Sequence, residues 1–222
     1  MPTRRSAARH TDQAMAAAAR QFMAVQAGYA GKGMALSQAA LCGARDFVEW
    51  AHYPANDCTD ADSGFEFYYH AHTRDEMSAD EHGHFHVFRR DPRRADKFFH
   101  VIGVSLDARG LPIKLFTTNT WVTGETMAPA TQVAKAAQQF GVKAHGRAAP
   151  IARWLTALMQ LYATEIAELA HERDEKLERL ASAGQSRNVL QQDRRVRVLS
   201  QRRVNVLKKL NQHCPTLKEV AP

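Results

Sequence analysis

Five histidines are crowded into one short segment of this chain. The sequence holds eleven histidines among 222 residues, and the crowded group consists of His70, His72, His82, His84 and His86. Neutral imidazole is the most common protein ligand of transition metals, and iron, zinc and copper all accept it. The segment therefore predicts a site for one such metal ion, with these five side chains as candidate ligands.

The spacing of these histidines fits two β-strands that each have one apolar and one polar face. Side chains alternate between the two faces of a strand, and in 65–72 and 82–89 aromatic or aliphatic residues alternate with the histidines. If both apolar faces are buried together, the facing pairs are His70–His84, Tyr68–His86 and His72–His82. Opposed Cβ atoms lie about 4.5–5.5 Å apart. The imidazoles are therefore expected to converge on one patch of sheet.

Acidic and phenolic groups near the histidines indicate what a bound metal would do. Glu66, Tyr68 and Glu76 are the candidates for proton transfer or for orienting the ligands. A carboxylate ligand favours iron or manganese, whereas histidines alone favour zinc or copper. An open coordination position would activate water or dioxygen on a small-molecule substrate. A metal store would use the same ligands without a substrate pocket, and a polar sheet face that binds no metal also fits the pattern.

The stretch from Gly64 to Gly83 resembles the first metal-binding motif of the cupin family. It reads Gly64, five residues, His70-Ala71-His72, three residues, Glu76, six residues and Gly83. The resemblance implies that His70, His72 and Glu76 bind the metal, with a fourth histidine from a second motif. The sequence contains no such second motif, so the resemblance is local and implies no cupin barrel.

The histidines need a sheet to hold them, and the composition predicts one. Strands are expected at 65–72, 82–89, 98–106 and 111–122, where aromatic and β-branched residues form short runs. The residues at 107–110 have the composition of a tight turn. His100 joins the histidine group if the third strand lies beside the second. The segment 53–64 is rich in Pro, Asn, Asp, Ser and Gly, and is expected to be a loop.

Helices are expected before and after this sheet. Hydrophobic spacing and capping residues predict them at 11–27, 37–51, 129–141, 150–184 and 187–213. The last two are expected to form a long antiparallel hairpin. The predicted fold class is α+β, with a small antiparallel sheet of about four strands packed with N-terminal helices and the C-terminal hairpin. We expect an α+β domain at 1–149, and the hairpin at 150–222 packed on it.

The positive charge of the chain lies at its C-terminal end. Residues 184–222 hold nine lysines and arginines against two carboxylates, which equals the whole formal charge of +7. This pattern suggests an alternative function, a non-enzymatic adaptor that binds nucleic acid or an acidic protein. Its candidate residues are Arg194, Arg195, Arg202 and Arg203. These arginines are also placed to neutralise the acidic segment 165–178, and the hairpin offers a surface for oligomerisation.

Other features of the sequence exclude several classes of protein. Three cysteines at irregular spacings fit neither a disulfide framework nor a thiolate zinc site. No run of about 18 apolar residues predicts a membrane span. No glycine-rich phosphate loop or Gly-x-Ser-x-Gly motif follows a predicted strand, which disfavours nucleotide-dependent enzymes and serine hydrolases. We therefore expect a soluble, cytoplasmic protein.

Overall fold

Six strands form one antiparallel sheet in the computed structural model, which describes residues 4–91 and 94–214. They are β1 (Tyr53–Thr59), β2 (Phe65–His70), β3 (Gly83–Asp91), β4 (Arg94–Leu106), β5 (Pro112–Thr118) and β6 (Val198–Arg203), and they lie in the sheet in chain order. The α+β class is confirmed, but the sheet has six strands rather than about four. The predicted α+β domain at 1–149 and the predicted hairpin at 150–222 include residues 1–3 and 215–222, which lie outside the described residues.

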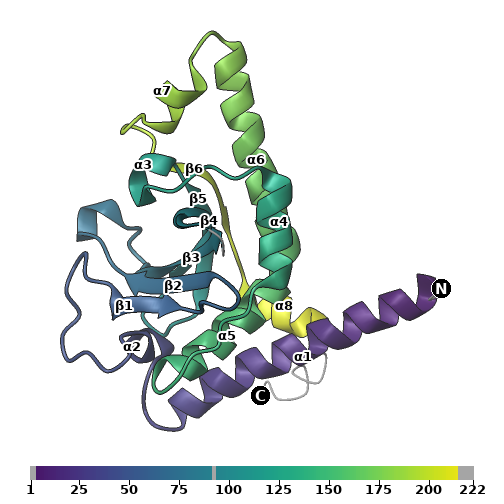
Figure 1. Cartoon of the computed structure of the whole chain (residues 1–222). Coiled ribbons are helices and arrows are strands. Elements are labelled where there is room, and N and C mark those ends of the chain that lie inside the picture. The colour runs from purple at the N-terminus through teal and green to yellow at the C-terminus, as the bar shows by residue number, and fades with distance from the viewer. Residues whose placement is uncertain (1–3, 92–93, 215–222) are drawn as a thin grey trace.

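Helices pack against one face of this sheet (Figure 1). The long helices are α1 (Arg4–Ala30), α4 (Ala130–Gln139), α5 (Ala148–Leu161) and α6 (Ala163–Ser182). The short ones are α2 (Leu36–Ala40), α3 (Thr120–Thr123), α7 (Arg187–Gln191) and α8 (Val206–His213), with a 3-10 turn at Arg74–Glu76. Among the described residues, no helix is long and apolar enough to span a membrane.

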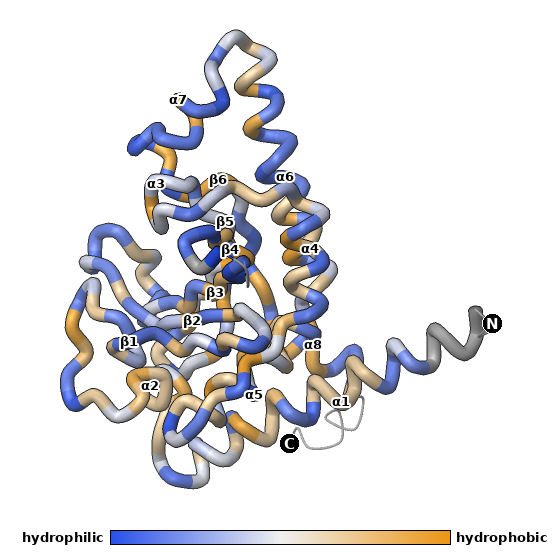
Figure 2. Tube along the Cα trace, in the orientation of Figure 1, coloured by the Kyte–Doolittle hydropathy of each residue, from blue (hydrophilic) through white to orange (hydrophobic). Residues whose placement is uncertain are grey.

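The hydrophobic core lies between the sheet and the long helices. Trp154 of α5 is fully buried, and its ring centre lies 5.2 Å from that of Phe22 in α1 and 5.9 Å from that of Phe85 in β3. Figure 2 shows hydrophobic and hydrophilic segments alternating along α4, α5 and α6, as expected for helices that bury one face. The odd-numbered aromatic and aliphatic residues of β2 and β3 belong to this core: Phe65, Phe67, Tyr69, Phe85 and Val87. Their even-numbered residues, which include the histidines, therefore point to the opposite side of the sheet.

The first half of the predicted loop at 53–64 is a strand. Residues Tyr53–Thr59 form β1, which pairs with β2 at the edge of the sheet and has an irregular register between Tyr53 and Cys58. An edge strand tolerates Pro54, because one of its sides needs no ladder hydrogen bonds. The turn that the composition predicts forms only after β1, where the Asp60 carboxylate accepts a hydrogen bond from the backbone N–H of Asp62.

The helix predicted over 187–213 is wrong in its middle part. The chain there forms α7, then β6, then α8. Asp193 accepts the backbone N–H of Arg195 in a turn, and the valines at 196, 198 and 204 favour an extended chain. Because β6 pairs with β5, a sixth strand takes the place of the second arm of the expected helical hairpin. The other arm, predicted at 150–184, divides into α5 and α6 at Tyr162.

Two other predicted elements end early. The helix predicted over 37–51 stops at Ala40, and Cys42 and Gly43 then adopt left-handed φ angles of 52° and 94°. The strand predicted over 111–122 stops at Thr118, because Asn119 caps α3 by accepting the Thr120 N–H. The chain after the first early end supplies Phe47 and Trp50, which stack on His82 and His72.

Candidate metal centre

Histidines face each other across the neighbouring strands β2 and β3. The facing pairs include His70–His84 and Tyr68–His86, so both of these predictions are confirmed. The ladder ends at His70 and His84, and the third predicted pair, His72 with His82, is not formed within the described ladder. His72 follows β2 in the loop that leads to the 3-10 turn.

His70, His72 and His84 form a group that can hold a metal ion. One ring nitrogen of each lies within 4.8 Å of those of the other two, and the residues are only 6%, 6% and 4% exposed. Their ring centres are 4.6, 4.8 and 4.9 Å apart. Three imidazoles on one tetrahedral zinc ion place their ring centres about 5 Å apart, because each Zn–N bond is about 2.0–2.1 Å long. The third member of this group is His84 rather than Glu76, which the cupin resemblance implied.

Glu81 fixes the orientation of His84. The Nδ1 of His84 lies 2.8 Å from Glu81 Oε1, and Lys114 donates to the other oxygen at 2.9 Å. Burial opposes ionisation of this carboxyl, but the hydrogen bond to His84 and the charge of Lys114 outweigh it and lower the pKa of Glu81 to about 2. An ionised carboxylate only accepts hydrogen bonds, so Nδ1 of His84 carries the proton. Its buried Nε2 has no hydrogen-bond partner among the described atoms, and it offers a lone pair in the neutral form of the ring.

His70 also has unpartnered ring nitrogens. Both are buried and lack a hydrogen bond within the described part of the chain. Burial, together with the neighbouring His84 and His72, lowers the pKa of His70 to about 2. The ring is therefore neutral at physiological pH, and one of its nitrogens offers a lone pair. Leaving a buried polar group unpaired costs about 1–3 kcal/mol, a cost that a bound metal would remove.

Three side chains contact His72. Trp50 stacks on its ring with 4.2 Å between ring centres, Arg197 donates to its Nδ1 at 2.7 Å, and Glu76 lies 3.6 Å from the same nitrogen. Burial and the neighbouring His84 lower the pKa of His72 to about 4, so the ring is neutral. Because Nδ1 accepts from Arg197, the proton of the neutral ring is on Nε2. Arg197 and a metal ion would therefore compete for the single lone pair of His72.

His86 of β3 connects the histidine group to His100 of β4. Its Nδ1 lies 2.9 Å from Nε2 of His100, and Nδ1 of His100 lies 3.1 Å from the Thr118 hydroxyl. When His86 donates to His100 and His100 donates to Thr118, Nε2 of His86 keeps a lone pair that faces neither partner. Its ring centre is 5.1 Å from that of His70 and 5.0 Å from that of His84. His86 is thus a neighbour of the triad.

The fifth candidate ligand, His82, lies apart from the other four. Its ring stacks on Phe47 with 4.8 Å between ring centres, and its Nδ1 lies 2.8 Å from the Tyr69 hydroxyl. Tyr69 belongs to the apolar face of β2 and passes close to Gly83, where an added Cβ would come within 2.7 Å of the hydroxyl oxygen. Because the strand ladder ends before His82, its ring is free to turn toward Tyr69.

The three residues predicted to transfer protons lie in different surroundings. Glu66 is bound by Arg90 through hydrogen bonds of 2.6 and 2.9 Å. Tyr68 stacks on His52 with 3.6 Å between ring centres, and burial raises its pKa, so its hydroxyl stays protonated. Glu76 lies beside the cavity described next. Of the three, Glu76 is therefore the best placed to meet a ligand of the metal.

A small cavity of about 50 Å³ opens beside His72, His84 and His86. Its polar lining includes Glu76, Lys114 and Arg197. A single water molecule needs about 10–15 Å³ of such space. The cavity therefore accommodates a few water molecules or one very small ligand next to the triad.

Several functional neighbours of the triad were not predicted from the sequence. Glu81, Lys114, Arg197 and Trp50 were missed. A local signal existed for Glu81, which lies three residues before His84. Trp50 gave none: it reaches His72 through a backbone with a left-handed φ of 68° and is 51% exposed. A bulky residue in this conformation stores about 1–3 kcal/mol of strain, a cost that is common at functional sites.

Several basic residues near the C-terminus form ion pairs within the molecule. The pairs are Arg202 with Glu168 and Glu172, Arg203 with Asp80, Arg195 with Asp193, and Lys209 with Glu165. The acidic segment 165–178 is therefore partly neutralised by basic residues, as expected, although Arg202 projects from a strand instead of a helix. Lys218, also counted in the basic segment, lies outside the described residues.

Together these features define an α+β protein with a buried histidine group on one face of an antiparallel sheet. A family model described as a domain of unknown function (DUF6969) matches residues 16–204. Because this match spans most of the chain, the protein belongs to that family. No curated protein and no solved structure shows a significant match to the chain.

Proposed function

We propose that this protein binds one transition metal ion through His70, His72 and His84. The observation that carries the proposal is the set of buried ring nitrogens of His70 and His84 that have no hydrogen-bond partner among the described atoms. The tautomer of His84, which Glu81 determines, directs its lone pair away from that carboxylate. A metal ion would bind one of these nitrogens on each ring at once, which supports a built site over a polar sheet face.

The donor set of the proposed site favours zinc or copper. It consists of imidazoles alone, whereas mononuclear iron sites commonly add a carboxylate. The nearest carboxylates are engaged elsewhere, since Glu81 binds His84 and Lys114, and Glu76 binds Arg197 at 2.7 Å. These contacts support an orienting role for Glu81 and a position outside the ligand set for Glu76.

We further propose that the open position of the metal faces the 50 Å³ cavity. Three imidazoles with one open position are a common catalytic arrangement, in which zinc lowers the pKa of a bound water to about 7. Lys114 and Arg197 would donate hydrogen bonds to a small molecule in the cavity, and Glu76 would accept a proton from it. The substrate is accordingly a small molecule that reaches the metal past Arg197.

Elemental analysis tests the metal proposal. Untagged protein is incubated with zinc or copper, dialysed against a mild chelator and analysed alongside His84→Ala. The matched control is His171→Ala, because His171 is an exposed histidine of α6. We expect about one equivalent of metal in the wild type and the control, and a loss of it in His84→Ala, because two remaining histidines do not supply the three protein ligands of such a site. Stoichiometric metal in His84→Ala, or none in the wild type, would contradict the proposal.

A further inference from the structure

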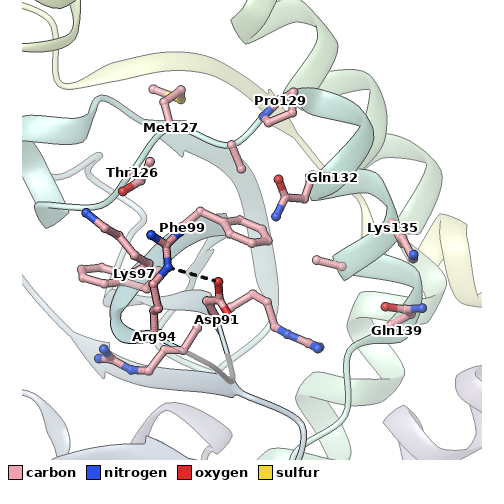
Figure 3. A pocket seen from close by; sticks show the side chains of 15 residues that line it. Asp91, Arg94, Lys97, Phe99, Thr126, Met127, Pro129, Gln132, Lys135 and Gln139 are labelled. Carbon is pink, nitrogen blue, oxygen red and sulfur yellow. Dashed lines mark ion pairs between the residues drawn. The ribbon is translucent and has the colours of Figure 1, made fainter.

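A second cavity lies at the other end of the β3–β4 hairpin, between this hairpin and α4 (Figure 3). Its volume is about 480 Å³, within the range of about 300–1,000 Å³ that is usual for small-molecule sites. Figure 3 shows Phe99 near the centre of the cavity, with Gln132 of α4 on one side and Arg94 and Lys97 of β4 on the other. No histidine is among the described residues that line it, so this cavity is distinct from the metal centre.

Positive charge dominates the lining of this cavity. Its cationic side chains are Arg89, Arg90, Arg94, Lys97 and Lys135, and its one carboxylate among the described residues is that of Asp91. The Asp91 carboxylate lies 3.8 Å from Arg94, and both side chains are partly exposed. Such pairs contribute little energy and exchange partners readily. The lining therefore carries a clear excess of positive charge.

The arginines of β3 are held in fixed positions by the sheet. The Arg89 guanidinium lies 4.3 Å from the centre of the Phe65 ring. That of Arg90 lies 4.9 Å from the centre of the Phe98 ring and is paired with the Glu66 carboxylate. Because Glu66 neutralises Arg90, the excess charge comes mainly from the other cations. Arg89 is thus a pre-positioned charge, which reduces the entropy lost when a ligand binds.

The remaining cations reach the cavity from two elements. Lys97 belongs to β4, where its ammonium lies 3.9 Å from the exposed carboxylate of Asp96, a distance that leaves it able to contact a ligand. Lys135 belongs to α4 and is exposed. Charges on opposite walls of a cleft concentrate a ligand of the opposite sign between them. The arrangement therefore favours an anion that spans the cavity from β4 to α4.

The cavity also offers apolar surface and neutral hydrogen-bonding groups. Phe99, Met127 and Ala136 supply apolar atoms, while Thr126 and Gln132 supply a hydroxyl and an amide. A bare inorganic anion would use only the charged part of such a lining. A ligand with an organic portion next to its anionic groups would use both parts.

We propose that this cavity binds a small phosphorylated organic molecule, with its phosphate groups held by Arg89, Lys97 and Lys135. A phosphate group has several oxygens that accept charge-assisted hydrogen bonds, so it can bridge cations that come from different elements. The organic portion contacts Phe99 and Met127. This mode of binding needs no glycine-rich phosphate loop, in keeping with the absence of that motif from the sequence.

Isothermal titration calorimetry of the full chain tests the proposal with ATP, inorganic triphosphate and adenosine as probes. The test variant is Lys97→Glu with Lys135→Glu. Its matched control is Lys32→Glu with Lys208→Glu, which reverses two exposed lysines outside the cavity. An unchanged circular dichroism spectrum confirms that both variants are folded.

We expect ATP to bind and adenosine not to bind, and the test variant to weaken ATP binding at least about tenfold while the control changes it by no more than about twofold. The proposal is overturned if ATP does not bind at about 1 mM, or if test and control variants lose affinity equally. Triphosphate that binds as tightly as ATP would overturn the part that assigns an organic ligand.

Discussion

The proton on His84 is the residue-scale feature on which the proposed metal site depends most. Glu81 holds that proton on Nδ1 and thereby directs the Nε2 lone pair into the triad. Glu81→Gln preserves the shape of the side chain but removes the carboxylate that fixes the tautomer. We expect it to weaken zinc binding about 10–100-fold, the usual effect of losing a group that orients a metal-bound histidine. Competition with a chromophoric zinc chelator measures this change.

Glu76→Gln is the matched control for that experiment. Glu76 is also a carboxylate close to the triad, but it lies 3.6 Å from His72 and its partner is the partly exposed Arg197. Because exposed ion pairs contribute little, we expect a change in zinc affinity of less than about threefold. Equal losses in the two variants would show that negative charge, and not the orientation of His84, sets the affinity.

Arg197 is expected to weaken metal binding, whereas Glu81 strengthens it. It donates to the nitrogen of His72 that holds the only lone pair of the neutral ring, and it adds a positive charge beside the site. Arg197→Gln removes the charge-assisted bond, which is worth about 1.5–3 kcal/mol, so we expect zinc to bind about tenfold more tightly. The chelator competition measures this gain, with Arg202→Gln as a control. Weaker zinc binding in Arg197→Gln would instead identify Arg197 as a residue that orients His72.

At the scale of elements, the pairing of β2 with β3 was predictable from the sequence. A slip of one residue would move Phe65, Phe67 and Phe85 from the core to the opposite face, so the alternating pattern allows one register. The observed ladder has that register and brings His70 opposite His84. The sequence also predicted that His100 joins the histidine group if the third predicted strand lies beside the second, and His100 contacts His86.

The pairing of β6 with β5 was not predictable, because long-range contacts determine it. Ser200 binds Thr117, which is 83 positions away, and the backbone carbonyl of Leu169. Such contacts override the local helical tendency of an arginine-rich segment. The same holds for Arg197, which meets His72 across 125 positions of sequence. Sequence periodicity therefore predicted the strand pair that carries the ligands, but not the segments that enclose them.

Gly103 of β4 is the position where the packing of this face is most easily disturbed. A Cβ there would lie 2.3 Å from the ring of Phe116, which packs edge-on against His84 and His86. We expect Gly103→Ala to lower the free energy of unfolding by about 1–3 kcal/mol, the usual cost of overpacking. Urea denaturation followed by circular dichroism measures this change.

Gly28→Ala is the matched control for Gly103→Ala. Gly28 lies in the last turn of α1 with no atom within 4 Å of an added Cβ. Because alanine favours a helix over glycine, we expect this control to raise the free energy of unfolding by about 0.5–1 kcal/mol. A change of the same sign in both variants would contradict the packing argument.

At the scale of the whole molecule, the buried histidines couple stability to pH. Burial is the main cause that lowers the pKa of His70 to about 2, that of His100 to about 3 and that of His72 to about 4, and it lowers the pKa of His86 well below 6.5. The unfolded chain then binds more protons than the folded one below about pH 6.5. The contribution of these neutral rings to the free energy of unfolding is fully present above that pH and is lost as the pH falls. Each histidine contributes about 1.4 kcal/mol per pH unit.

Glu125 acts in the opposite direction. Burial raises its pKa from 4.5 to about 7. Between these two pH values the folded chain therefore binds one more proton at this carboxyl than the unfolded chain does. The contribution of Glu125 to the free energy of unfolding accordingly decreases as the pH rises. It offsets one of these four histidines, and the metal-free protein should lose about 3–4 kcal/mol of its free energy of unfolding between pH 6 and pH 5. Urea denaturation at the two pH values measures the loss. In Glu125→Gln the offset is gone, so the loss should grow by about 1.4 kcal/mol. Equal stability at both pH values would show that the rings are not buried as neutral imidazoles.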